Sequence, residues 1–222
     1  MPRLIEDTHY TIIDDFLEED LWTKVWSAYQ FTDLLPVTQT SGAWKLDDGI
    51  PLGGREIILP RHRKEGESSP ETPVTEVDQP FLELLSAVLD AEEYGRRLVD
   101  DQWKKIAGRA YVYPRETGLS WHVDDSETYA GAFIYYAHPI WNAHWGGELM
   151  LAEPPEEPLP VMAYRFETET YSQELMDLGV GQFIAPKPNR LVLLGGAPHM
   201  IAQVKAAAGH NVRASVAGFF LR

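Results

Sequence analysis

Two stretches in the first half of the chain carry apolar residues at helical spacing. In the first, Leu17, Leu21 and Val25 recur on one face, after a short β-branched run at 10–13. In the second, apolar positions recur at i, i+3 and i+4 between Phe81 and Leu98. The pattern predicts a strand followed by two amphipathic helices, each of which buries one face against the rest of the protein.

After Trp103 the pattern changes to short runs that alternate apolar and polar residues or are rich in β-branched residues. The predicted strands are 106–113, 119–123, 130–136, 147–152, 182–184, 190–194, 200–204 and 212–221. We recognise no helical pattern between them, which favours an antiparallel sandwich or barrel. The expected fold class is α+β, with a jelly-roll core (a double-stranded β-helix) supported by the N-terminal helices.

The segment 36–80 is polar and rich in Gly, Pro and Ser, apart from a short apolar run at 57–59. We expect a long loop with one short strand. Loops of this length in compact domains are usually functional, so 36–80 is a candidate lid. With no repeat and no linker in view, 1–222 is expected to form a single domain, with supporting helices in 1–103 and the jelly roll in 104–222.

Composition and charge narrow the expected partners. The 222 residues are 44% hydrophobic and 24% charged, as in globular proteins. The 19 Lys and Arg against 34 Asp and Glu give a formal net charge of −15, which disfavours nucleic acid and anionic membranes as partners. The same charge would attract a cationic small molecule, so a small-molecule substrate is expected.

The absence of cysteine rules out disulfides, thiolate metal sites and a cysteine nucleophile. No apolar run reaches the length of a membrane span, and the first residues do not resemble an export signal. We therefore expect a cytoplasmic protein. The sequence makes no prediction of its oligomeric state.

His122 and Asp124 lie two residues apart at the end of a predicted strand, so their side chains project from the same face. His199 begins another predicted strand. Two imidazoles and one carboxylate can occupy one face of an octahedral ion and leave three positions open, as in non-haem Fe(II) oxygenases. An H-x-D triplet also arises by chance in surface loops, so the triplet alone does not decide the matter.

The sequence around the triplet contains further motifs in a characteristic order. They are Tyr113, Gly118, 134–136, Trp141, 146–149, 190–194 and 213–215. With them, the region 106–221 resembles the prolyl-hydroxylase-like branch of the iron(II)/2-oxoglutarate-dependent dioxygenases. The resemblance implies that His122, Asp124 and His199 bind Fe(II) and form the catalytic centre. It also implies 2-oxoglutarate as cosubstrate, dioxygen as oxidant and stimulation by ascorbate.

Arg213 lies in an apolar predicted strand, where a buried guanidinium needs an anion. By resemblance, a basic residue after the distal histidine binds the far carboxylate of 2-oxoglutarate, and Arg213 takes that role. Ser215 lies two residues on, hence on the same face, and can add a hydrogen bond. Two alternatives stay open: an ion pair of Arg213 with a protein carboxylate, and Lys205 as the anion binder.

Tyr135 and Tyr136 are neighbours on a predicted strand, so only one of them can face the interior of the barrel. By resemblance that residue is Tyr135, which would donate a hydrogen bond to the same carboxylate. Tyr113 is a further candidate donor to 2-oxoglutarate, and a position in the core is its alternative. We interpret Gly146 and Gly147 as a bulge before a strand.

The expected activity is hydroxylation or oxidative cyclisation of a small cationic metabolite, of the amino acid or aminoglycoside type, in specialised metabolism. Asp124 retains the carboxylate that halogenases of the wider superfamily lack, so halogenation is not expected. A protein prolyl or peptidyl hydroxylase is the alternative within the enzyme class. An alternative of another class is a cupin-like metal-dependent binding protein or isomerase without oxygenase activity.

Overall fold

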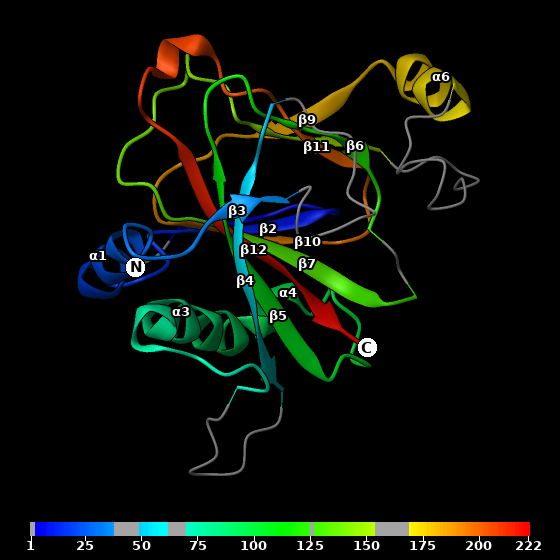
Figure 1. Ribbon diagram of the computed structural model, residues 1–222. Helices are drawn as coiled ribbons and strands as arrows, with labels where there is room; N and C mark the ends of the chain where they lie inside the picture. Colours follow the sequence, from blue (N-terminus) through cyan, green and yellow to red (C-terminus); the bar gives the residue numbers. More distant parts are fainter. Residues whose placement is uncertain (1–2, 38–48, 62–69, 125–126, 154–168) are drawn as a thin grey trace.

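Two β-sheets form the centre of the molecule, and helices cover the outer face of the larger one (Figure 1). The computed structural model describes residues 3–37, 49–61, 70–124, 127–153 and 169–222. The arrangement confirms the predicted jelly-roll core with supporting helices. Among the described residues, no helix combines the length and the apolar character that a membrane span needs.

The larger sheet has eight strands, and every neighbouring pair is antiparallel. In spatial order the strands are β1 (Arg3–Glu6), β2 (Tyr10–Asp14), β10 (Arg190–Leu194), β7 (Tyr129–Tyr136), β12 (Arg213–Leu221), β5 (Lys105–Tyr113), β4 (Leu52–Pro60) and β3 (Leu35–Pro36). The last strand of the chain, β12, thus lies in the middle, between β7 and β5.

The smaller sheet has four antiparallel strands. In spatial order they are β6 (Leu119–His122), β11 (His199–Ile201), β8 (Leu149–Ala152) and β9 (Gly181–Ile184). A cluster of buried residues from both sheets joins them, including Ile134 and Val192 from the large sheet and Leu149 and Leu151 from the small one. The space between the sheets is therefore partly filled by a hydrophobic core.

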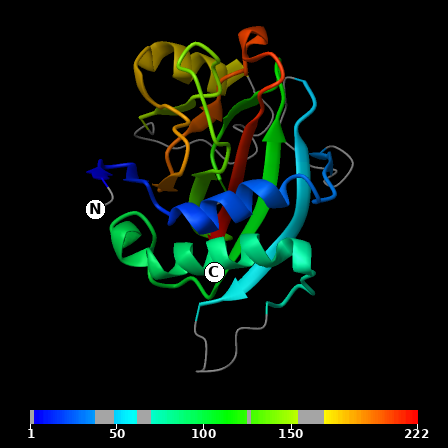
Figure 2. The same cartoon turned by 90° about the vertical axis from the view of Figure 1, so that its left-hand side faces the viewer.

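The described helices are α1 (Glu19–Ala28), α3 (Gln79–Asp90), α4 (Glu92–Gly95) and α6 (Glu169–Leu178), with short 3-10 turns η1 (Glu76–Asp78) and η2 (Ala206–Ala208). Helices α1 and α3 lie side by side across the large sheet (Figure 2). Their buried apolar faces, among them Val25, Leu84 and Val88, belong to the same core cluster as the outer side of the sheet. This burial confirms the two amphipathic helices predicted from the spacing of apolar residues.

A glycine in β5 lets α3 approach the sheet closely. A Cβ atom at Gly108 would lie 2.5 Å from Cδ2 of Leu85, nearer than real Cβ contacts allow. Leu85 is fully buried at this point. The small residue thus allows a large leucine to pack against the backbone of the sheet.

Two elements differ from the sequence prediction. Helix α6 interrupts the predicted run of strands, although Tyr171, Leu175 and Leu178 do recur at helical spacing. The short strand predicted at 57–59 within the segment 36–80 is part of a longer strand, the nine-residue β4, in which Arg55 and Glu56 are exposed while Ile57 and Leu59 are buried. The parts of that segment at 38–48 and 62–69 lie outside the described residues, so a lid there stays a prediction.

Candidate active site

His122 and His199 face each other across two paired strands. Strand β6 ends at His122, β11 begins at His199, and the two residues are direct partners in the antiparallel ladder. Directly opposed residues project from the same side of a sheet, and the centroids of these two rings lie 4.2 Å apart. The register of two short strands thus brings together histidines from distant parts of the sequence.

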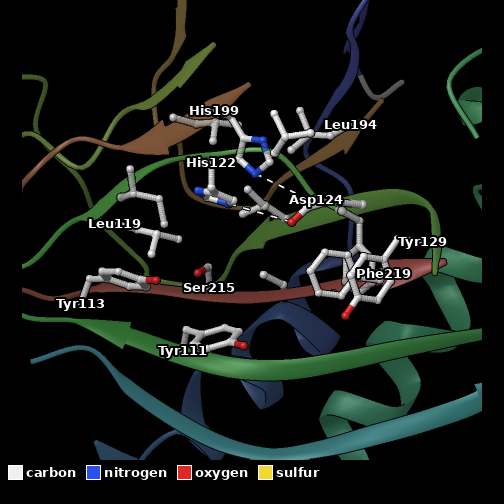
Figure 3. A pocket seen from close by; sticks show the side chains of 18 of the residues that line it. Tyr111, Tyr113, Leu119, His122, Asp124, Tyr129, Leu194, His199, Ser215 and Phe219 are labelled. Carbon is white, nitrogen blue, oxygen red and sulfur yellow. Dashed lines mark ion pairs between the residues drawn. The ribbon is translucent and has the colours of Figure 1, made fainter. Parts of the chain in front are cut away.

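Asp124 lies two residues beyond the end of β6 and completes the group. Its Oδ1 lies 4.0 Å from Nε2 of His122, and its Oδ2 lies 3.6 Å from Nε2 of His199. One potential ligand atom from each residue lies within 4.8 Å of the other two. Figure 3 shows both imidazoles directed toward the carboxylate.

Backbone carbonyls orient both imidazoles. Nδ1 of His122 lies 2.8 Å from the carbonyl oxygen of Ser120, and Nδ1 of His199 lies 2.9 Å from that of Ala197. When each Nδ1–H donates to its carbonyl, each Nε2 keeps its lone pair for the space shared with Asp124. Both histidines are buried, which fixes their rings in place. This tautomer is the one that a metal ligand requires.

A cavity of about 310 Å³ lies beside these three residues (Figure 3). Its walls are largely aromatic and aliphatic, and the same cavity is lined by Arg213 and Ser215. Tyr113 and Tyr111 on β5 are direct partners of Arg213 and Ser215 on β12. The floor of the cavity is therefore the inner side of the large sheet, and the candidate metal ligands come from the small sheet and the segment after β6.

Arg213 is completely buried, with 0% of its surface exposed. Its Nε donates a hydrogen bond of 2.9 Å to the carbonyl oxygen of Gly147, and its Nη1 donates one of 3.2 Å to Oγ of Ser215. Among the described residues, Nη2 has no hydrogen-bond partner. A buried charge with an unsatisfied donor at the edge of a cavity is suited to an anionic ligand.

Two tyrosine rings and a glycine surround this guanidinium. Its Cζ lies 5.3 Å from the ring centroid of Tyr113 and 4.9 Å from that of Tyr136. Gly147 has φ of +74°, and a Cβ there would lie 3.0 Å from Cδ of Arg213. The Gly146–Gly147 pair, interpreted from sequence as a bulge, thus also makes room for Arg213.

Residues 108–221, more than half of the chain, match the model of a family described as the 2OG-Fe(II) oxygenase superfamily. The chain belongs to the 2OG-Fe(II) oxygenase superfamily. The protein is therefore a dioxygenase that uses Fe(II), 2-oxoglutarate and dioxygen. No curated protein sequence matches the chain.

Several solved structures share the fold of this oxygenase. A prolyl-4-hydroxylase from Pseudomonas putida is 18% identical with a TM-score of 0.55, covering 96% of this chain and 92% of that one. A prolyl hydroxylase from Trichoplax adhaerens, in complex with a hypoxia inducible factor oxygen degradation domain peptide fragment, is 16% identical with a TM-score of 0.56, covering 96% and 83%.

HygX from Streptomyces hygroscopicus, solved with nickel, 2-oxoglutarate and hygromycin B, is 13% identical with a TM-score of 0.54. The match covers 94% of this oxygenase and 81% of HygX. At these low identities the three structures establish the common fold and leave the substrate of this oxygenase open.

The side chains of this oxygenase suit the two cofactors of its family. Two imidazoles and one carboxylate, converging on one point, are a donor set that Fe(II) accepts. At another side of the same cavity, the unsatisfied Nη2 of Arg213 suits a carboxylate.

The prediction that Tyr135 faces the cavity is wrong. Tyr135 lies on the helix-facing side of β7, where its ring packs against Phe16 and its hydroxyl donates a hydrogen bond of 3.0 Å to Oδ1 of Asn189. Burial there raises the pKa of Tyr135. Tyr136 occupies the inner side and contacts Arg213. Alternation allows either assignment, and the resemblance pointed to the wrong member of the pair.

Neither alternative for Arg213 receives support from the structure. Lys205 is exposed just before η2 and is not part of the cavity lining. Within the described part of the chain, Arg213 forms no ion pair with a carboxylate. Tyr113 and Ser215 both line the cavity, as the sequence analysis expected of residues that contact the cosubstrate.

His138, which was not among the candidate site residues, contacts the backbone of the strand that carries Arg213. Its Nδ1 lies 3.1 Å from the carbonyl oxygen of Ala214, and its Nε2 lies 2.8 Å from that of Pro186. Burial lowers its pKa to about 4, with a further contribution from the charge of Arg213, against the opposing effect of the two carbonyls. His138 is thus a neutral structural residue.

Proposed function

We propose that the protein is an oxygenase in which His122, Asp124 and His199 bind Fe(II) and are the catalytic residues. In the same proposal, Arg213, Ser215 and Tyr113 bind 2-oxoglutarate, and the enzyme hydroxylates or oxidatively cyclises a small metabolite. The observation that carries this proposal is the unsatisfied Nη2 of buried Arg213, in the lining of the cavity that holds the three candidate ligands.

The role of Arg213 follows from the cost of burying its charge. A buried guanidinium without a counter-charge is unfavourable, and a carboxylate matches its planar fork through two parallel hydrogen bonds. Nε and one hydrogen of Nη1 are already engaged, which leaves Nη2 and the second hydrogen of Nη1 as donors for a ligand. The hydroxyl of Ser215 supports the guanidinium and can turn its own hydrogen toward the same carboxylate.

Fe(II) and 2-oxoglutarate, when bound, supply the oxidation, in which dioxygen converts 2-oxoglutarate to succinate and carbon dioxide and provides the oxygen atom for the substrate. The protein holds the reacting groups in position. The carbonyls of Ser120 and Ala197 engage Nδ1 of both imidazoles, which leaves Nε2 as the atom directed at the metal position, and Asp124 adds a carboxylate. The apolar walls limit the entry of water.

The expected substrate is a small, cationic metabolite of the amino acid or aminoglycoside type. The net charge of −15 attracts cations, and the cavity of about 310 Å³ is at the lower end of ligand sites. Because 2-oxoglutarate fills part of it, only a small molecule or a single substituent fits beside the metal. We also propose that residues 1–222 act as one oxygenase domain, since a single buried cluster joins helices α1 and α3 to the large sheet.

The test is succinate formation by protein supplied with Fe(II) and 2-oxoglutarate, with panels of free amino acids, aminoglycosides and proline-containing peptides. We expect stimulation by a member of the first two panels. Stimulation by peptides alone would replace this substrate class with the peptidyl hydroxylase alternative. Failure to bind 2-oxoglutarate anaerobically in the presence of Fe(II) would contradict the assignment of the site itself.

A further inference from the structure

Arg109 is a second arginine on the inner side of the large sheet. On β5 it is the direct partner of Ala217 on β12, and Ala217 is in turn the partner of Ile134 on β7. Residues in register project from the same side of a sheet, and both Ala217 and Ile134 line the cavity. Arg109 therefore lies in the same cross-strand row as Ala217 and Ile134, one strand away from Ala217.

The guanidinium of Arg109 has no counter-charge. Its Nε is buried and without a hydrogen-bond partner, and within the described residues the side chain forms neither a hydrogen bond nor an ion pair. An unsatisfied buried donor on a charged group is costly. Because the residue as a whole remains partly exposed, a ligand can reach it.

The side chain of Arg109 lies along the sheet beside Tyr111. A Cβ built on Gly53 would lie 3.4 Å from Cδ of Arg109 and 3.5 Å from Cε1 of Tyr111, so both side chains occupy the space above that glycine. Burial raises the pKa of Tyr111 to about 12, and the positive charge of Arg109 acts against this rise. Arg109 is thus in electrostatic contact with a hydroxyl of the cavity lining.

Glu56 continues this cross-strand row onto the next strand, β4. It is the direct partner of Arg109 on β4, is exposed, and forms no ion pair with Arg109. A purely structural cross-strand pair would bring the two charges into contact. Instead, the carboxylate of Glu56 and the guanidinium of Arg109 come from neighbouring positions on β4 and β5 without pairing, so each charge is available to a ligand.

We propose that Arg109 binds a carboxylate of the substrate and Glu56 its ammonium group, so that the substrate is a free α-amino acid. This inference rests on the proposed function and selects one of its substrate classes, because aminoglycosides carry no carboxylate. The small side chain of Ala217 leaves room for the substrate to extend from the rim toward Asp124.

The two arginines start from well-separated backbone positions. Arg213 and the partner of Arg109, Ala217, are four residues apart on β12, which corresponds to about 14 Å along the strand. At the end of the cavity away from Arg213, Tyr129 and Phe219 stack with centroids 4.0 Å apart and an interplanar angle of 17°. This pair offers an apolar wall for the side chain of the amino acid (Figure 3).

The experiment measures succinate formation with Fe(II), 2-oxoglutarate and each proteinogenic L-amino acid, its methyl ester and its decarboxylated amine. We expect a free amino acid to stimulate turnover, and its ester and amine to fail. Arg109→Gln should raise the apparent KM for that amino acid by about 30-fold or more, and Arg109→Lys should recover part of the loss. Glu56→Gln should raise the KM for the amino acid and leave that for its desamino analogue unchanged.

Two controls separate this inference from the proposed function. Arg3→Gln removes an exposed arginine on β1 and should leave the KM for the amino acid unchanged. Anaerobic titration of Fe(II)-loaded Arg109→Gln with 2-oxoglutarate, followed by its charge-transfer absorption, should give the wild-type affinity. A loss of 2-oxoglutarate binding in this variant would assign Arg109 to the cosubstrate and overturn the inference.

The remaining outcomes are also decisive. If amines, aminoglycosides or peptides stimulate turnover and Arg109→Gln responds as wild type does, the inference is wrong while the proposed function stands. The same holds if wild type binds 2-oxoglutarate but no free amino acid stimulates it. If wild type does not bind 2-oxoglutarate at all, the proposed function fails, and the inference fails with it.

Discussion

Arg213 and Arg109 share one property that ordinary structural arginines lack, which is a buried nitrogen without a hydrogen-bond acceptor among the described residues. Arg190, by contrast, forms an ion pair with the carboxylate of Asp14. Burial acts to raise the pKa of Asp14, but Arg190 and Lys187 lower it overall. Burying a charged group without a partner costs several kcal/mol. We propose that ligands complete the structure at these two places.

Arg213→Ala should weaken 2-oxoglutarate binding by about 30-fold or more, because the variant leaves the far carboxylate without its charged partner. Fe(II) binding should change little, since Arg213 is not among the three candidate ligands. Arg213→Lys should restore charge without the fork geometry and recover part of the affinity. Anaerobic titration of the Fe(II)-loaded variants measures both effects. Unchanged affinity in Arg213→Ala would remove this residue from the cosubstrate site.

Replacing any one of His122, Asp124 and His199 by Ala should abolish turnover and sharply weaken Fe(II) binding, because two ligands no longer hold the ion. His144→Ala is the matched control, since this histidine is exposed and lies outside the cluster. Equilibrium dialysis with Fe(II), under anaerobic conditions, measures the binding. Retained affinity in the His199 variant would contradict the proposed metal site.

At the scale of elements, local patterns predicted most strands and both supporting helices, because alternation and helical spacing are local consequences of burial. The predictions failed where burial is decided by distant partners. Strand β4 is half exposed and contains two glycines, so only its part at 57–59 was predicted from the sequence. The rest of the strand depends on its pairing with β5. The face to which Tyr135 points depends on the register between β7, β10 and β12, which no local pattern reveals.

The segment that leads into β8 should be intolerant of a side chain at Gly147. Ala there must adopt a positive φ, at a cost of about 1–2 kcal/mol, and its Cβ would displace Arg213. We expect Gly147→Ala to lower the melting temperature and to weaken 2-oxoglutarate binding together. Gly196→Ala is the control, because no atom of the described residues lies within 4 Å of its Cβ position. Equal effects of the two substitutions would show that Gly147 has no special role.

At the scale of the whole molecule, the sequence provided the candidate metal ligands but not their surroundings. The H-x-D spacing and the later histidine can be recognised in the sequence alone. The convergence of Arg213, Gly147 and Tyr136 arises only when β12 lies between β5 and β7. The row that joins Glu56, Arg109 and Ala217 likewise exists only through pairing of strands distant in sequence.

Global stability should fall as the pH drops below neutral, in part through His138. Its pKa is lowered by burial to about 4 from the usual 6.5, so between these values the unfolded chain takes up a proton that the native protein excludes. Stability from this group is therefore present above about pH 6.5 and lost as the pH falls toward 4, by about 3 kcal/mol in total. Urea unfolding of wild type and His138→Gln at pH 7, 5.5 and 4.5 measures the loss. The same slope in both proteins would exclude His138 as its source.

Among the described strands, β6 lies at the edge of the small sheet and has β11 as its one neighbour. The ladder between them has the pairs His199–His122 and Ile201–Leu119, with an irregularity in between. Such a short edge opens easily and then offers unpaired backbone to other chains. If His122 and His199 share an ion as proposed, it ties the two strands together, so iron supply should set how long the folded protein survives in a cell. Hydrogen exchange at 119–122 should be faster without Fe(II), and metal-starved cells should clear or aggregate this enzyme first.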